Sequence, residues 1–143
     1  MGYDNDNIFA KILRGEMPAF SVYESSECLA FMDVMPQSDG HTLVLPKSPA
    51  ENLFDLDEKA AATLINAVQH VARGVRAAFE PDGIRIMQFN GVAAGQSVFH
   101  IHMHIVPVYA GQPMAAHARG MAPAEILEAH AEKIRGALVQ YAG

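Results

Sequence analysis

Cysteine and tryptophan are almost absent from this 143-residue chain, which holds one cysteine, Cys28, and no tryptophan. A single cysteine cannot form a disulfide within the chain, so the class of small secreted domains held together by disulfides is excluded. Long apolar runs are also missing, and none approaches the ~18 residues that a membrane-spanning helix requires. The first residues, MGYDNDN, are acidic, whereas a secretory leader begins with basic residues. We therefore expect a cytoplasmic protein that does not contact a membrane.

Basic residues are too few for a protein that holds nucleic acid through its phosphates. The chain has 10 Lys and Arg against 16 Asp and Glu, a formal net charge of -6, and no run of one sign. Non-specific nucleic-acid binding depends on clustered Lys and Arg, so this function class is not expected. With 50% hydrophobic residues, the chain can bury a full apolar core, as domains of about 150 residues do. We predict one domain over residues 1–143.

Helical and strand periodicities follow one another irregularly along the chain. Apolar residues recur every three or four positions from Leu64 to Phe79, which predicts a long helix over residues 58–79. Asp55 and Glu58 resemble a capping box at its start. The other predicted elements are helices over 8–14 and 123–141 and strands over 20–23, 28–32, 42–45, 84–90 and 100–108. Because strands and helices do not alternate, the pattern indicates an α+β fold with an antiparallel sheet of about five strands.

Three histidines stand at alternate positions in the last predicted strand: His100, His102 and His104. Aliphatic residues fill the positions between them, and in a strand this period places the imidazoles on one face and the aliphatic side chains on the other. A lone histidine is usually a packed or a surface residue, but packing alone does not explain three in phase. The segment 100–108 is therefore the predicted centre of the function.

Clustered imidazoles serve two kinds of chemistry. In a zinc site neighbouring histidines share one ion, but at about 3.3 Å per residue the outer two Cα atoms lie about 13 Å apart, too far for all three rings to reach it. In nucleophilic attack on phosphorus one neutral imidazole attacks, and its neighbours donate hydrogen bonds to the phosphate. Glycines in the loop 91–95 let backbone N–H groups approach that anion, and Ser97 adds a hydroxyl donor. We predict the phosphorus chemistry, without a metal ion or a cofactor.

The stretch from Gly95 to Pro107 resembles the His-φ-His-φ-His-φ-φ signature of the histidine triad (HIT) family, where φ is an apolar residue. Further matches run in the family's order through residues 8–18, 31–36 and 40–47. The chain is most similar to the Hint branch, because Asn90 and Ser97 stand where the Fhit branch has Gln and Thr. The resemblance implies a HIT fold with its motifs in residues 8–108 and a C-terminal helical extension over 109–143.

The resemblance also implies catalytic roles. Hint proteins cleave the P–N bond of nucleoside phosphoramidates, AMP derivatives above all, through a nucleotidyl-histidine intermediate. In this chain His102 is then the nucleophile, and His104 contacts the phosphate. His100 and His41 support the network of protons and hydrogen bonds, and Ser97 lies near the leaving group.

A purine nucleotide, an AMP or GMP derivative, is the ligand that the resemblance implies. Asp33 accepts hydrogen bonds from the ribose hydroxyls. The apolar slot for the base is formed by Phe9, Ile12, Phe31, Val34 and Leu43. The remaining nucleotide-binding residues are Asn90 on the phosphate side, Gly95, Gln96, Ser97 and Val98.

Assembly, zinc and activity complete the expectations from the family. The resemblance implies a homodimer whose sheet is continuous across the interface. Some bacterial relatives hold a structural zinc partly through Cys-x-x-Cys near the first helix, but here Asn7, Ala10 and Pro49 occupy ligand positions, so zinc is not expected. Three functions stay open: hydrolysis of phosphoramidates or acyl-nucleotides, a family activity such as dinucleoside polyphosphate hydrolysis or nucleotidyl transfer, and non-catalytic purine-nucleotide sensing.

Overall fold

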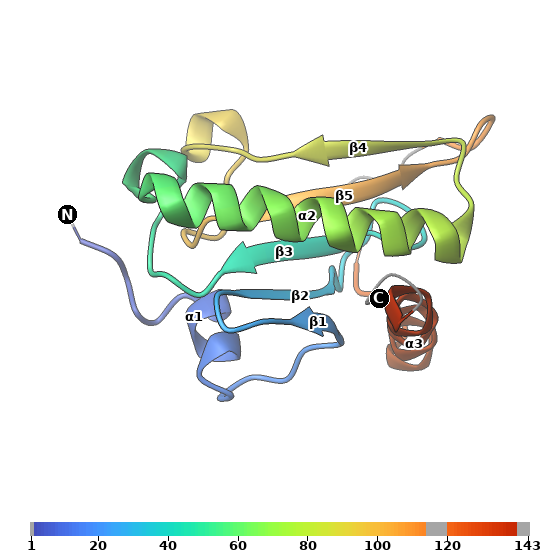
Figure 1. Cartoon of the computed structure of the whole chain (residues 1–143), viewed down its shortest axis with the longest axis horizontal. Coiled ribbons are helices and arrows are strands. Elements are labelled where there is room, and N and C mark those ends of the chain that lie inside the picture. Colours follow the sequence, from blue (N-terminus) through green and yellow to red (C-terminus); the bar gives the residue numbers. More distant parts are fainter. Residues whose placement is uncertain (1, 114–119, 140–143) are drawn as a thin grey trace.

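A five-stranded sheet forms the centre of the computed structural model, which describes residues 2–113 and 120–139 (Figure 1). The order of the strands is β1-β2-β3-β5-β4, and all neighbours run antiparallel. The strands span Ser21–Glu24 (β1), Cys28–Met32 (β2), Thr42–Pro46 (β3), Gly83–Met87 (β4) and Met103–Val108 (β5). The prediction of an α+β fold with an antiparallel sheet of this size is confirmed.

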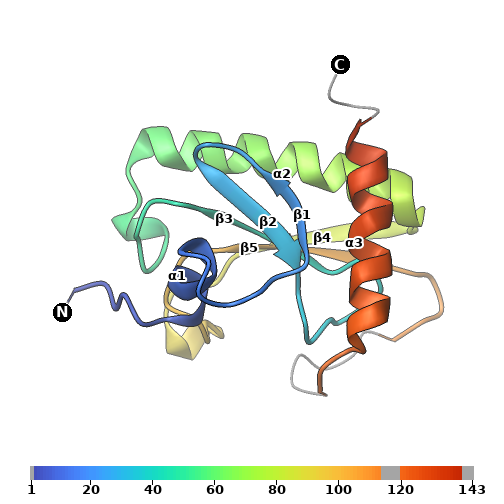
Figure 2. The same cartoon turned by 90° about the horizontal axis from the view of Figure 1, so that it is seen from below.

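Helices cover both faces of this sheet. Figure 2 shows α2 on one face and the short α1 on the opposite face, while α3 crosses one end of α2. The helices span Ile8–Leu13 (α1), Glu58–Phe79 (α2) and Ala124–Val139 (α3), and two 3-10 turns span Leu53–Asp55 (η1) and Val92–Ala94 (η2). No helix in the described part of the chain has the length and the apolar character that crossing a bilayer would need.

Alternate strand residues enter two separate apolar clusters, as the period of a strand requires. The helix-side cluster joins α2 and α3 to one face of the sheet, and its strand residues are Val22, Cys28, Ala30, Met32, Val44 and Ile105. The α1-side cluster lies on the other face and consists of Phe9, Leu29, Phe31, Leu43 and Leu45. Because the histidines alternate with Ile101 and Ile105 of the helix-side cluster, they are directed towards the α1 side.

The cap of α2 and the bounds of two strands differ from the predictions by more than one residue. Asp57, not Asp55, caps α2 by accepting a hydrogen bond from the Ala60 N–H, because Asp55 already belongs to η1. The strand predicted over 84–90 ends at Met87, and the strand predicted from His100 begins at Met103. Of the helix predicted to residue 141, positions 140 and 141 lie outside the described residues.

A glycine permits the close contact between α2 and α3. Gly74 in α2 is buried, and a Cβ atom added there would lie 2.4 Å from Cδ2 of Leu138 in α3. Real Cβ atoms do not approach other atoms this closely, since packed atoms repel one another well before that distance. The α3 helix therefore sits directly on the backbone of α2.

Candidate active site

Four histidines of the described part of the chain are buried: His41, His100, His102 and His104. His104 lies in β5 opposite Leu43 of β3, and His41 immediately precedes β3. The segment that leads into β5 is fixed to the loop after β3, because the Ile101 N–H donates to the Ala50 carbonyl at 2.9 Å. Of these four residues, His104 lies within a strand, whereas His41 precedes β3 and His100 and His102 precede β5.

The imidazole of His102 has a defined tautomer. Its Nδ1 lies 2.7 Å from the backbone carbonyl of His100. A carbonyl oxygen only accepts hydrogen bonds, so Nδ1 carries the proton and Nε2 carries the lone pair. Phe9 holds the ring edge-to-face, with ring centroids 4.8 Å apart. The arrangement gives His102 the form that a nucleophilic imidazole requires.

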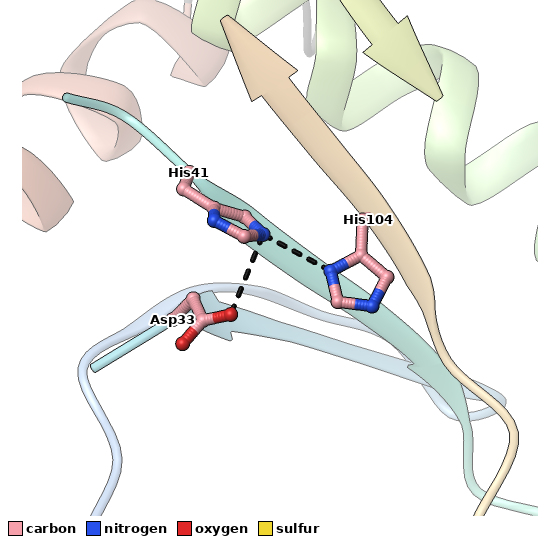
Figure 3. Close-up of side chains that lie close together, drawn as sticks. All are labelled: Asp33, His41 and His104. Atoms are coloured by element: carbon pink, nitrogen blue, oxygen red, sulfur yellow. Dashed lines mark hydrogen bonds and ion pairs between the residues drawn. The ribbon is translucent and has the colours of Figure 1, made fainter. Parts of the chain in front are cut away.

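His41 and His104 form a second hydrogen-bonded unit, drawn in Figure 3. The backbone N–H of Gln37 donates to Nδ1 of His41 at 3.0 Å, so His41 carries its proton on Nε2. That Nε2 lies 3.0 Å from Nδ1 of His104 and therefore donates to it. A neutral His104 then has its own proton on Nε2, where it is a donor for an anionic oxygen.

Asp33 completes this unit behind His41. One carboxylate oxygen, Oδ1, accepts the N–H of Met35 at 2.8 Å, and the other, Oδ2, lies 3.4 Å from Nε2 of His41 (Figure 3). The carboxylate is buried, with 5% of the residue exposed. A buried negative charge beside the Nε2–H of His41 favours keeping the proton on that nitrogen.

The same three side chains lie close enough together to be considered as ligands of one metal ion. Ligand atoms of Asp33, His41 and His104 all lie within 4.8 Å of one another. A histidine that binds a metal normally donates its other ring N–H to an acceptor, but Nδ1 of His41 faces the N–H donor of Gln37. Binding through Nε2 would therefore require removal of the proton that this contact places there. The donor set fits a hydrogen-bonded chain better than a metal centre.

A pocket of about 240 Å³ opens beside His102 and His104. This volume is below the range of about 300–1,000 Å³ that ligand pockets usually measure. Phe89 packs against His104, with ring centroids 5.4 Å apart. The other residues that line the pocket are Gln37, Met87, Ala94, Gly95 and Ser97.

The residues predicted to hold the base are brought together with one exception. Phe9, Phe31 and Leu43 belong to the α1-side cluster, and Ile12 and Val98 pack against it. Val34 instead packs against the helix-side cluster. The structure thus places four of the five predicted slot residues in or against the α1-side cluster, whose Phe9 contacts the ring of His102, and places Val34 against the opposite cluster.

The glycine loop differs from the expected cradle for an anion. The N–H groups of Gly91, Ala94 and Gly95 donate to acceptors within the loop itself. Gln96 holds this loop in place: its amide donates to the carbonyls of Glu51 and Val98, and its Oε1 accepts the Gly91 N–H. The expectation that these backbone N–H groups face a phosphate is therefore wrong for Gly91, Ala94 and Gly95, and the described contacts of Gln96 are structural.

Asn90 likewise makes contacts within the protein. Its Oδ1 accepts the Leu53 N–H at 2.9 Å and the side-chain amide of Gln88 at 2.8 Å. These bonds join the segment after β4 to η1, at the same end of the sheet as the pocket loop. Asn90 was predicted on the phosphate side, and its described bonds give it a role in shaping the loops around the pocket.

Four residues of the site were missed by the sequence analysis: Tyr3, Gln37, Met87 and Phe89. Met87 ends β4 and Phe89 follows two positions later, a spacing that in an extended segment directs both side chains to one face and could have paired them. Gln37 stands next to Pro36, in the segment that carried the family resemblance. Tyr3 contacts His100 across 97 positions of the chain, and no local sequence pattern predicts that contact.

The two cysteine positions of the zinc-binding relatives have other uses here. Asn7 is the N-cap of α1, and its side chain accepts the N–H of Ala10 at 2.9 Å. Ala10 is buried beneath this helix turn. Neither side chain provides a thiolate or an imidazole, so these positions do not fit the structural zinc.

Comparison with known proteins identifies the family. The sequence model described as "HIT domain" matches residues 14–111. The chain belongs to the HIT family. Protein hit of Bacillus subtilis is 46% identical to this HIT protein over 102 residues, which cover 71% of this chain and 70% of its own. The resemblance inferred from the triad and its supporting motifs is confirmed.

Solved and characterised relatives support the fold and indicate the range of chemistry. The crystal structure of a Hit-like protein from Bartonella henselae superposes on this chain with a TM-score of 0.89 and 48% identity, covering 95% of this chain and 99% of the other. Adenylylsulfatase HINT3 of Arabidopsis thaliana is 37% identical over 103 residues, 72% of this chain and 52% of the relative. The HIT fold thus extends over almost the whole chain.

Proposed function

We propose that this HIT protein hydrolyses nucleoside 5′-phosphoramidates or acyl-nucleotides, AMP derivatives above all, through a covalent nucleotidyl-His102 intermediate. The observation that carries the proposal is the bond from Nδ1–H of His102 to the His100 carbonyl at 2.7 Å. This bond leaves the lone pair on Nε2 of a ring that lines the pocket. A neutral imidazole held this way is a competent nucleophile near pH 7.

The first step replaces one bond to phosphorus by another. The lone pair of His102 Nε2 forms a bond to the α-phosphorus, and the P–N bond of the phosphoramidate breaks. The departing nitrogen keeps the bonding electron pair and takes one proton from the hydrogen-bond network of the site. His104 would donate its Nε2–H to a phosphate oxygen, a role supported by the bond that its Nδ1 accepts from His41. Ser97, in the pocket wall, supplies a hydroxyl near the leaving group.

The second step regenerates the enzyme. The oxygen of a water molecule bonds to phosphorus, the P–Nε2 bond breaks, and its electron pair returns to His102. The proton that water loses replaces the one that the amine took. The net reaction is water plus phosphoramidate giving a nucleoside monophosphate plus an amine, and no step needs a metal ion because hydrogen-bond donors stabilise the developing charge.

The nucleotide would lie between the pocket and the α1-side cluster. The family resemblance assigns the base to this cluster and the ribose to Asp33, whose carboxylate is buried beside His41. Burial of a planar apolar base among aromatic and aliphatic side chains is the usual way in which such sites gain affinity. We accordingly propose a purine nucleotide as the ligand.

Turnover of adenosine 5′-phosphoramidate tests the proposal directly. Wild type, His102→Ala and a matched control, His70→Ala, are incubated with substrate in EDTA, quenched in acid and analysed by intact-mass spectrometry. His70 is a histidine on α2 that contacts Tyr23 and lies outside the site. We expect turnover and an AMP adduct in wild type and in the control, and neither in His102→Ala. Absence of turnover and adduct in wild type would refute phosphoramidate hydrolysis.

A second candidate substrate follows from the relatives. Adenylylsulfatase HINT3 acts, by its name, on an adenylyl sulfate, in which sulfate replaces the amine as leaving group on the same α-phosphorus. A panel of adenosine phosphoramidate, adenylyl sulfate and diadenosine polyphosphates separates the three leaving groups by kcat/KM. Binding of AMP without turnover of any member, and with loss of binding in Asp33→Ala, would instead support the sensor.

We also propose that the protein is a homodimer formed through β4. This strand lies at an edge of the described sheet and pairs only with β5 there. Its Ile86 is 43% exposed. The N–H and C=O groups along an edge strand with exposed apolar side chains can pair with the same strand of a second copy. Light scattering coupled to size exclusion should give the mass of a dimer for wild type and a monomer for Ile86→Lys. A monomeric wild type would overturn this assignment.

A further inference from the structure

We propose that Tyr3 is a positioning residue of the active site: its hydroxyl fixes the imidazole of His100, whose backbone carbonyl in turn fixes His102. The kinetic part of this inference rests on the proposed function, whereas the contact itself does not. Tyr3 lies outside residues 14–111, the part that matches the HIT domain. The N-terminal segment would thus be a working part of the site.

The contact between Tyr3 and His100 is defined on both sides of the imidazole. Nε2 of His100 lies 2.7 Å from the Pro46 carbonyl at the end of β3, so Nε2 carries the proton. Nδ1 is then an acceptor, and it meets the hydroxyl of Tyr3 as donor. The two rings pack edge-to-face with centroids 5.6 Å apart. His100 is 0% exposed, so these two bonds satisfy both nitrogens of a buried ring.

The N-terminal segment is itself fixed to the domain. The guanidinium of Arg14 donates to the Asn5 carbonyl at 2.7 Å, and Asn7 caps α1. Tyr3 therefore extends from a segment with two anchors at the start of α1. An anchored segment loses less entropy when its side chain makes a contact than a free one would, which favours a persistent bond to His100.

The effect of Tyr3 reaches the nucleophile through one residue. The same His100 whose side chain is held by Tyr3 and Pro46 supplies the carbonyl that accepts Nδ1–H of His102 at 2.7 Å. A shift of His100 displaces this carbonyl and with it the ring of His102. Small misplacements of a reacting group reduce the rate far more than they reduce binding, because near-attack geometry is lost.

The protonation of His100 offers a separate readout. Burial lowers the pKa of His100 from its ordinary value. Two other titratable side chains act on this imidazole: Tyr3 by the hydrogen bond and His102 by its charge. A hydroxyl that donates to Nδ1 stabilises the neutral ring, so its removal should raise the pKa of His100.

The test compares Tyr3→Phe with Tyr109→Phe. Both variants keep the ring and remove one hydroxyl, but the Tyr109 hydroxyl donates to the Asp39 carbonyl and not to a histidine. Two measurements are made on each variant and on wild type. The first is the ¹⁵N and ¹H resonances of the histidine rings, which report the tautomer without requiring activity. The second is kcat, KM and the pH profile of kcat with adenosine 5′-phosphoramidate.

We expect Tyr3→Phe to shift the ring resonances of His100 and His102, to lower kcat about tenfold and to leave KM within about twofold. The acidic limb of the kcat profile should move to higher pH. Tyr109→Phe should change none of these. Unchanged His100 and His102 resonances in Tyr3→Phe would overturn the proposal, and so would shifted resonances with unchanged kcat and pH profile.

Failure of the proposed function is distinguishable from failure of this inference. If wild type turns over none of the substrates of the panel, the hydrolase is refuted, and the resonances alone decide the role of Tyr3. Movement of both His100 and His102 on removal of the Tyr3 hydroxyl then supports the positioning role. A shift of the His100 resonances alone overturns the positioning role, because that role requires His102 to respond together with His100.

Discussion

His41 donates its Nε2–H to Nδ1 of His104 at 3.0 Å, and this bond decides which nitrogen of His104 can face a substrate. The direction of the bond follows from the Gln37 N–H, which occupies Nδ1 of His41. His104 thereby presents an Nε2–H donor, while His102 presents an Nε2 lone pair. The Nε2 atoms of these two imidazoles, whose centroids are 5.0 Å apart, thus differ in protonation: one is a hydrogen-bond donor and the other carries a lone pair.

His41→Leu removes the donor that sets the tautomer of His104. We expect kcat to fall about a hundredfold, because His104 no longer holds its proton on Nε2 in a fixed orientation. The free energy of unfolding should also fall by about 1–3 kcal/mol, since the Gln37 N–H is left buried without its acceptor. Steady-state kinetics and urea titration measure the two effects, with His70→Leu as the control. An active His41→Leu would remove this unit from the mechanism.

Gly74 and Gly136 give a matched pair for the docking of α3. Gly74→Ala places a Cβ atom 2.4 Å from Leu138, and we expect a net loss of about 1–2 kcal/mol, because overpacking outweighs the better helix propensity of alanine. Gly136 has no atom within 4 Å of its added Cβ, so Gly136→Ala should gain about 0.5–1 kcal/mol. Both values come from denaturant titration.

The contact itself can be tested by a second substitution. Leu138→Ala combined with Gly74→Ala should be less destabilising than the sum of the two single variants, because the shortened side chain makes room for the new Cβ. Additive losses, or a gain for Gly74→Ala equal to that for Gly136→Ala, would mean that α3 does not pack on Gly74.

Cys28 should be inert in the folded protein. It is 1% exposed within β2, and burial raises the pKa of its thiol, so the reactive thiolate is scarce and shielded. We expect a chromogenic disulfide reagent at pH 8 to label the native protein far more slowly than the protein unfolded in guanidinium. Rapid labelling of one thiol per native chain would show that β2 opens or that the burial is wrong.

Sequence patterns predicted the elements that have a regular apolar periodicity and missed the contacts between residues that are distant in the chain. The apolar stripe of α2 defined that helix from 58 to 79, and alternation of histidines with Ile101 and Ile105 defined the two faces at the triad. The cap was misplaced by two residues because Asp55 and Glu58 fit a capping box locally, while η1 takes Asp55. The local sequence allowed either aspartate to cap the helix, and only the tertiary structure decides between them.

The tautomers of the site lay beyond sequence reasoning for a similar reason. The side chain of His100 is set by Pro46, 54 positions away, and by Tyr3, 97 positions away. His41 meets His104 across 63 positions. The order of the family motifs predicted that these histidines gather, because motif order carries the topology. Which nitrogen donates depends on backbone groups such as the Gln37 N–H, whose direction only the folded chain defines.

The stability of the protein should depend on pH through His100. Burial lowers its folded-state pKa below the unfolded value, which is about 6.5 for a free histidine. Below about pH 6.5 the unfolded chain then binds more protons at this site than the folded chain, so the free energy of unfolding decreases as pH falls. The stability that the neutral His100 contributes is fully present above about pH 6.5. It is lost as the pH falls towards the folded-state pKa, with a slope of at most about 1.4 kcal/mol per pH unit.

His100→Gln tests this dependence, because it keeps a donor for the Pro46 carbonyl and removes the titrating group. Urea titrations of both proteins between pH 5 and pH 8 should therefore show a steeper acidic slope for wild type, and equal slopes would mean that His100 is accessible to protons in the folded state.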